Sequence, residues 1–194
     1  MNKQKRIEIF TRLRAENPKP TTELNFGNDF QLLVAVVLSA QATDKGVNRA
    51  TATLFKKVRT PAAMLELGEE GLKEHIKTIG LFNTKAKNIL RTCAILVERH
   101  GGRVPGDRAA LEALPGVGDY TTGAVLSIAF GRPEPIVDGN VQRVLSRLFA
   151  VPGNVRRNPA RREIRELAAA AVLGGSPAEV NQGLMELGAL VCLP

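Results

Sequence analysis

Residues 114–118 read Leu-Pro-Gly-Val-Gly, and this stretch decides how the chain around it folds. It joins two segments of helical hydrophobic spacing into a tight hairpin, in which Gly116 and Gly118 can adopt positive φ and let a backbone approach closely. Amides entering the second helix would then point outward at its positive end, which suits a phosphate oxygen. Asp119 would repel a phosphate and is interpreted as a cap of that helix. An ordinary connection between helices, in which Val117 simply packs, fits the same stretch.

A single acid follows twenty residues after this loop, in Ile136-Val-Asp138-Gly-Asn-Val141. Asp138 precedes a predicted helix, so capping that helix is one interpretation. The alternative is a carboxylate that stabilises a sugar oxocarbenium ion or activates a water, as cleavage of a glycosidic bond requires. Its spacing from a phosphate-binding hairpin favours chemistry on a DNA nucleotide.

Helical periodicity runs through nearly the whole chain, which predicts an all-α fold of about ten helices without a convincing strand or fixed repeat. The first helix carries an apolar stripe and ends near Pro18. The stripe consists of Ile7, Phe10, Leu13 and Arg14. The later helices are expected at about 30–41, 44–57, 61–68, 71–78, 84–99, 109–114, 119–130, 140–149, 159–173 and 177–191. The expected N-caps are Asn28 or Asp29, Thr60, Asp107, Asn158 and Ser176, the last in a capping box with Glu179.

Composition agrees with packed helices and with a polyanionic partner. The 194 residues are 44% hydrophobic and only 4% aromatic, which favours helices over a β-sandwich. The formal net charge is +8. Together with the hairpin, this positive charge favours nucleic acid as the partner.

The sequence also predicts where the protein works. Its basic N-terminus leads into an amphipathic stretch, which predicts that no signal peptide is present. The longest apolar run, 32–38, is too short to span a bilayer. The two cysteines make no disulfide framework. We therefore expect a bacterial cytosolic, nucleoid-associated protein without membrane contact.

Several longer motifs resemble the helix-hairpin-helix glycosylases of base excision repair. The N-terminal part resembles endonuclease III in Leu38–Asp44, Lys77–Asn83 and Ala109–Gly118. The C-terminal part resembles the MutY adenine glycosylases in Tyr120–Val125, Val137–Leu145 and Asn181–Ala189. These motifs cover almost the whole chain, which is therefore interpreted as a hybrid of the two, natural or engineered.

The resemblance implies a fold and a partner. It implies two α-helical lobes with a DNA cleft between them. One lobe is a six-helix barrel at about 22–132 that carries the hairpin, and the other combines 1–21 with 133–194. The implied substrate is double-stranded DNA with a lesion or mismatch, bound by a monomer.

The resemblance also carries over catalytic groups, with two departures. Asp138 matches the catalytic aspartate of both families. Tyr120 stands where endonuclease III has the lysine that attacks the sugar, and tyrosine forms no Schiff base. MutY-like sequences often carry tyrosine there, although a plain pocket-wall residue is the other interpretation. Val36 matches the glutamate that MutY uses as general acid, so adenine excision is expected to be weak or absent.

Further residues match DNA-contacting positions. Gln41 and Leu81 correspond to the wedge that fills the hole left by a flipped nucleotide, although a leucine after a glycine is more often a core residue. Arg143 and Arg147 lie one helical turn apart after Asp138, where phosphate contact and plain solvent exposure are equally expected. The expected DNA-binding set consists of Gln41, Leu81, Gly116, Val117, Gly118 and Arg143.

The family's [4Fe–4S] cluster is expected to be absent. Both families usually continue from Cys192 into three more cysteines, whereas this chain ends at Leu193-Pro194. One thiolate does not hold a cluster that normally needs four, so no metal or cofactor is expected. MutY's domain for recognising 8-oxoguanine is expected to be absent as well.

Three functions therefore compete. The leading hypothesis is a monofunctional, weak DNA glycosylase that flips a damaged or mispaired base and hydrolyses its N-glycosidic bond. The second is a damaged-DNA-binding protein with little catalysis. The third is an endonuclease III-like glycosylase with lyase activity, for which Lys45 is a distant candidate amine.

Overall fold

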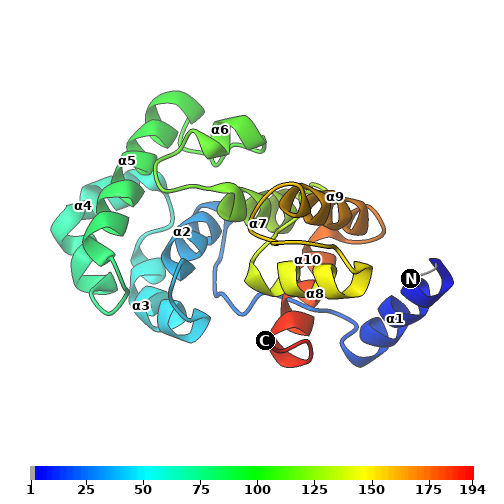
Figure 1. The fold of residues 1–194 in the computed structure, drawn as a ribbon. Coiled ribbons are helices and arrows are strands. Elements are labelled where there is room, and N and C mark those ends of the chain that lie inside the picture. The colour runs from blue at the N-terminus through cyan, green and yellow to red at the C-terminus, as the bar shows by residue number, and fades with distance from the viewer. Residues whose placement is uncertain (1–2) are drawn as a thin grey trace. The chain divides into compact units, whose positions relative to one another are not determined.

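The computed structural model describes residues 3–194, apart from several side chains of the first helix, and within them the fold is entirely helical (Figure 1). The described helices are α1 (Lys3–Glu16), α2 (Asp29–Ser39), α3 (Asp44–Lys57), α4 (Pro61–Ile76), α5 (Phe82–His100), α6 (Arg108–Glu112), α7 (Asp119–Phe130), α8 (Gly139–Phe149), α9 (Ala160–Val172) and α10 (Pro177–Leu190). The all-α prediction is confirmed. The side chains of the predicted stripe Ile7, Phe10, Leu13 and Arg14 lie outside the described part.

The chain divides into two compact units. We call Glu23–Phe130, which contains α2 to α7, the hairpin unit. The terminal unit combines the described residues up to Thr22 with Gly131–Pro194, and thus contains α1 and α8 to α10.

The buried helix α2 is the centre of the hairpin unit. Every residue from Phe30 to Leu38 is buried, because the sequence there is apolar on almost all sides of the helix. Helices α3, α5 and α7 pack around it, and α4 packs against α3 and α5 (Figure 1). The one buried polar side chain of α2, Gln31, donates from Nε2 to Phe55 O and Val58 O at 2.8 and 3.0 Å, which ties α2 to the end of α3.

Local capping chemistry sets most helix starts in this unit. Asn28, Thr60 and Asp107 each accept a hydrogen bond from the backbone amide three residues later, as predicted. Gly101 ends α5 with φ 58°. The two short helices predicted around Gly68 are parts of one element, α4, kinked at that residue with φ 73° and ψ 175°.

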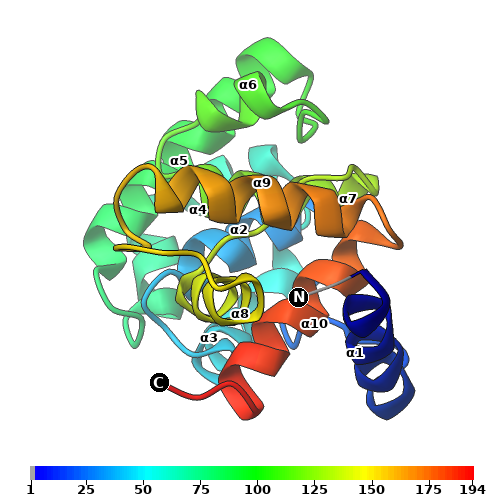
Figure 2. The same cartoon turned by 45° about the vertical axis from the view of Figure 1, so that its right-hand side comes forward.

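In the terminal unit, α8, α9 and α10 pack around an apolar core (Figure 2). Its buried members include Val141, Leu145, Ile164 and Leu184. Asn181 on α10 is buried, and it fixes the extended segment before α8 by accepting from Ile136 N at 2.9 Å and donating to Glu134 O at 2.8 Å. This segment carries Asp138 to the start of α8.

Two predicted caps in the terminal unit are wrong. Ser176 precedes α10, but its side chain makes no capping hydrogen bond, so the predicted capping box is absent. Pro159, not Asn158, occupies the cap position of α9, and proline offers no side-chain acceptor. Among the helices described, none is long and apolar enough to cross a membrane.

Candidate functional site

The hairpin between α6 and α7 depends on Gly116 for its shape. Gly116 has φ 78°, a conformation that side-chain-bearing residues rarely adopt. A Cβ added there would lie 3.0 Å from Asn88 Nδ2 and 3.1 Å from Asn88 Cβ. The buried Val117 donates from its amide to Leu114 O at 3.1 Å, which closes the turn. Gly116 is therefore required by the fold, for its backbone angle and for its contact with α5.

Gly118 does not use the positive φ that its residue type permits. Its φ lies outside the left-handed region, and an added Cβ would meet no atom within 4 Å. Its carbonyl accepts from Thr122 N at 2.9 Å, so Gly118 takes the place before α7 that was predicted for Asp119. Asp119 is the first residue of α7 and pairs with Arg108 at 2.8 Å. The approach to the backbone of α7 at Gly118 is open.

Two positions with a predicted connection to catalysis lie on helices of the hairpin unit. Tyr120 is the second residue of α7, directly after the hairpin, and 40% of it is exposed. Val36 lies in the middle of α2 and is 2% exposed. A valine in the core transfers no proton. Of these two positions, only Tyr120 therefore offers a polar side chain.

Gln41 and Leu81 lie on two neighbouring loops. Both have positive φ, 61° and 57°. Leu81 is 66% exposed, so the interpretation as a core residue is wrong. A Cβ added at Gly80 would lie 4.0 Å from Gln41 O, which places Gly80 near the backbone of Gln41.

Lys85 is a residue that the sequence analysis missed. It lies on α5 and is 8% exposed, and its Nζ donates to Leu38 O at 2.8 Å and Ala40 O at 2.6 Å. Burial lowers the pKa of its ammonium group, because desolvation disfavours the charged form. The sequence signal that could have revealed its burial is its position four residues before the buried Ile89, on the apolar face of α5.

In the terminal unit, Asp138 caps α8 and both of its carboxylate oxygens have partners. Oδ1 accepts from Val141 N at 2.7 Å, which confirms the capping interpretation. Oδ2 accepts from Asn140 Nδ2 at 3.0 Å. These two bonds fix the plane of the carboxylate at the positive end of a helix, which stabilises a negative charge.

Arg143 connects Asp138 to the last residues of the chain. Its Nη2 donates to Asn140 Oδ1 at 2.8 Å and to Gly188 O at 2.5 Å, and its Nε donates to Cys192 O at 2.6 Å. Arg143 is thus not simply solvated, while its contact with DNA stays a prediction. The neighbouring Arg147 donates to Leu193 O at 2.6 Å.

Gly188 makes this network possible. A Cβ added there would lie 2.5 Å from Asn140 Cβ and 2.9 Å from Asn140 Cα. Since such distances are far below van der Waals contact, only glycine lets α10 approach the first turn of α8 this closely.

The cysteines do not fit the cluster that the family usually carries. Such a cluster needs four thiolates, and the sequence has two cysteines. Cys93 is fully buried in the hairpin unit, where burial raises the pKa of its thiol to about 12, and Cys192 belongs to the terminal unit. Within residues 3–194, no group of three His, Cys, Asp or Glu side chains gathers into a metal site.

Residues 34–170 match the family model of the HhH-GPD superfamily base excision DNA repair proteins. The chain belongs to this family. Endonuclease III of Escherichia coli (strain K12) is 63% identical to it over 153 residues, which cover 79% of this chain and 72% of that protein. The family membership makes the protein a DNA-binding glycosylase of base excision repair.

Solved structures of HhH-GPD relatives support the fold over the full length. The structure of a trapped endonuclease III–DNA covalent intermediate matches with a TM-score of 0.84 at 34% identity, covering 100% of this chain and 89% of the other. That of a thermostable thymine-DNA glycosylase matches with a TM-score of 0.85 at 29% identity, covering 98% and 89%. The HhH-GPD fold of the chain thus rests on both sequence and structure.

The substitution Gly188→Ala tests the close approach of α10 to Asn140, whose amide bonds to Asp138. We expect Gly188→Ala to lower the free energy of unfolding by about 1–3 kcal/mol, because its methyl group overlaps Asn140. Gly183→Ala on the same helix is the control: its Cβ meets Pro20 Cγ at an ordinary 3.6 Å. It should be neutral or stabilising by up to about 1 kcal/mol, from helix propensity. Urea denaturation followed by circular dichroism measures both, and equal effects would refute the close contact.

Proposed function

We propose that the protein is a monofunctional glycosylase, which hydrolyses the N-glycosidic bond with water and forms no Schiff base with the sugar. The observation that carries this proposal is Tyr120, half-exposed at the start of α7 and directly after the hairpin. A phenol has no amine with which to attack C1′ of the sugar, so a covalent imine does not form there.

Asp138 would then be the group that stabilises the transition state. As the N–glycosidic bond breaks, positive charge develops on the sugar, and a fixed carboxylate nearby lowers its energy. The hydrogen bonds from Val141 N and Asn140 Nδ2 hold that carboxylate in one orientation before the substrate binds. Preorganisation of this kind supports an electrostatic role for Asp138, or its use as the base for the attacking water.

The leaving base is proposed to be an oxidised or saturated pyrimidine. Adenine leaves well only when an acid protonates it, and the position that resembles the MutY acid is the buried Val36. Damaged pyrimidines are better leaving groups, and their departure depends less on protonation by an acid. The resemblance of Tyr120–Val125 and Val137–Leu145 to MutY therefore concerns the water-using mechanism rather than the adenine substrate, and the hybrid interpretation remains part of this proposal.

An endonuclease III-like glycosylase with lyase activity is the second candidate. The 63% identity to endonuclease III, together with the match to a trapped endonuclease III–DNA covalent intermediate, favours it. This mechanism requires an amine from another residue, because Tyr120 has none. Lys45, exposed on α3, is the candidate from the sequence. Borohydride trapping on abasic DNA separates the two candidates.

We also propose that the protein acts as a monomer on duplex DNA in the bacterial cytosol and without an iron–sulfur cluster. Its two cysteines support the last point. Sedimentation equilibrium, iron analysis and the visible absorbance of the purified protein test these properties together.

Substitution of Asp138 tests the glycosylase itself. Base release is measured with and without alkali, on duplexes that contain dihydrouracil, thymine glycol, or adenine opposite 8-oxoguanine. We expect Asp138→Asn to slow release by at least about a hundredfold, because the amide keeps the cap but loses the charge. Asp107→Asn, a matched cap on α6, should leave the rate unchanged. Equal rates in the wild type and Asp138→Asn would rule out catalysis by Asp138, and tight binding without any release would favour a damaged-DNA-binding protein.

Restoring an amine at position 120 tests the monofunctional mechanism. Strand breaks by the wild type should appear only after alkali. Tyr120→Lys is expected to give a borohydride-trapped DNA adduct that the wild type lacks, because its amine can form the imine. Tyr120→Phe is the control without an amine. Trapping by the wild type would contradict the proposal and favour the lyase.

Two glycines of the hairpin should separate fold from DNA binding. Gly118→Ala is expected to leave stability nearly unchanged but to weaken duplex affinity by about 1.5 kcal/mol or more, since a methyl group would block a phosphate from the α7 amides. Gly116→Ala should instead lower the free energy of unfolding by more than about 1 kcal/mol, from its positive φ and the contact with Asn88. Filter binding and urea denaturation provide the two readouts. Unchanged affinity of Gly118→Ala would argue against the phosphate contact.

A further inference from the structure

Two exposed loops of the hairpin unit hold residues in an unfavourable backbone conformation. Within the described part of the chain, the residues other than glycine with positive φ are Gln41, Leu81 and Ala150. Ala150 ends α8, where the left-handed conformation is common. Leu81 precedes α5 instead, as its N-cap. Strain of this kind persists only where the surroundings fix it.

Gln41 is the third residue of a type II turn. Ala40 has φ −55° and ψ 112°, and Ala42 N donates to Ser39 O at 2.9 Å across the turn. The third position of a type II turn needs positive φ and usually holds glycine or asparagine. A glutamine there costs free energy, and its side chain is exposed.

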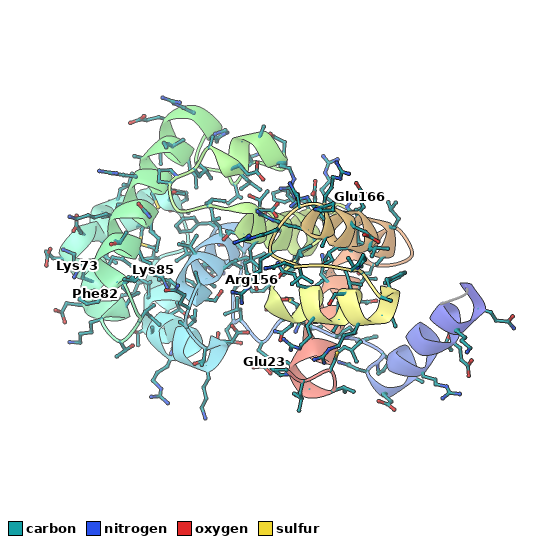
Figure 3. The ribbon with its side chains drawn as sticks, in the orientation of Figure 1. Glu23, Lys73, Phe82, Lys85, Arg156 and Glu166 are labelled. Carbon is teal, nitrogen blue, oxygen red and sulfur yellow. The ribbon has the colours of Figure 1, made fainter. Side chains whose placement is uncertain are left out.

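Lys85 bonds to both of these loops. Its backbone N–H donates to Leu81 O at 3.0 Å. Its Nζ donates to Leu38 O and to Ala40 O, the carbonyls on either side of the end of α2. Figure 3 shows Lys85 in the first turn of α5, next to Phe82. One residue therefore joins the turn of Gln41 to the loop of Leu81.

The chemistry of Lys85 matches the end of α2. The last carbonyls of a helix lack partners within it and carry the negative end of its dipole. Helix α2 has no basic residue of its own in its last turn, so Lys85 supplies the positive charge from α5. Both acceptors are neutral, and a buried ammonium group without a carboxylate is costly. Burial of an apolar side chain at this position would cost less free energy.

Resting on the proposed base-flipping function, we propose that Lys85 is a positioning residue that fixes Gln41 and Leu81 in register as one preformed wedge. Leu81 offers an exposed apolar side chain and Gln41 an exposed polar one, and Gly80 lies near the backbone of Gln41. Held in this way before binding, the two side chains enter the duplex without a further loss of loop entropy. Lys85 itself touches no nucleotide in this role.

The test follows extrusion of a base and needs no glycosidic chemistry. Duplexes carry 2-aminopurine at the target position, and stopped-flow fluorescence measures how fast it unstacks on binding. We expect Lys85→Met to slow this step by at least about tenfold, because the wedge is misplaced. Affinity for a single-stranded oligonucleotide, which offers no hole to fill, should stay unchanged. Lys87→Met, exposed on the same helix, is the control for loss of one positive charge.

Three further variants decide between positioning and a merely structural role. Lys85→Arg should restore extrusion, because its guanidinium also donates to carbonyls. Leu81→Ala should slow extrusion, and adding Lys85→Met to it should cause no further loss, since residues that act as a unit are not additive. Should Lys85→Met fail to fold, Lys85→Gln, which keeps one donor, takes its place with an intermediate loss expected.

Several outcomes would overturn the inference. These are an extrusion rate of Lys85→Met equal to the wild type, additive losses with Leu81→Ala, or a parallel loss of single-strand affinity and thermal stability. A wild type that extrudes no base refutes the wedge, whereas its release of damaged bases would leave the glycosylase standing. A wild type that extrudes bases but releases none refutes the proposed function and leaves the role of Lys85 intact.

Discussion

Burial of α2 is the constraint on which the hairpin unit depends. Every residue from Phe30 to Leu38 is removed from water, and each large apolar side chain contributes about 1.5–3 kcal/mol. A helix buried on all sides must be covered on all sides, here by α3, α5 and α7. Packing of α7 on α2 places the hairpin and Tyr120, and the end of α2 places Gln41. The geometry of these candidate DNA-contacting groups thus follows from one buried helix.

Most candidate functional groups lie at helix ends, for a shared electrostatic reason. Helix ends expose backbone groups without partners, and these bind charges of opposite sign. Asp138 uses the start of α8, and the open backbone at Gly118 offers the start of α7 to a phosphate. Lys85 uses the opposite end, the carbonyls of α2. The charged groups of these candidate sites are therefore held by the same interactions that begin and end the helices.

Local sequence patterns predicted those features that depend on a few neighbouring residues. The helices and the caps at Asn28, Thr60, Asp107 and Asp138 follow from periodicity and side-chain chemistry within one turn. Either hairpin glycine could adopt positive φ, but only Gly116 does, because the turn needs that conformation at one glycine only. The capping box at Ser176 is absent although its residues are present. Such a motif permits a hydrogen bond, while the path of the preceding chain decides whether it forms.

The sequence by itself determined the helical class, the hairpin, the acid at Asp138 and the tyrosine in place of a lysine, because these are properties of residue type and short spacing. Only the tertiary structure decided what Lys85, Arg143 and Gly188 do. Lys85 meets carbonyls 45 and 47 residues away, and Arg143 meets carbonyls 45 and 49 residues away. No local pattern encodes such partners, because they meet only after the helices have packed and burial has fixed which polar groups must satisfy one another.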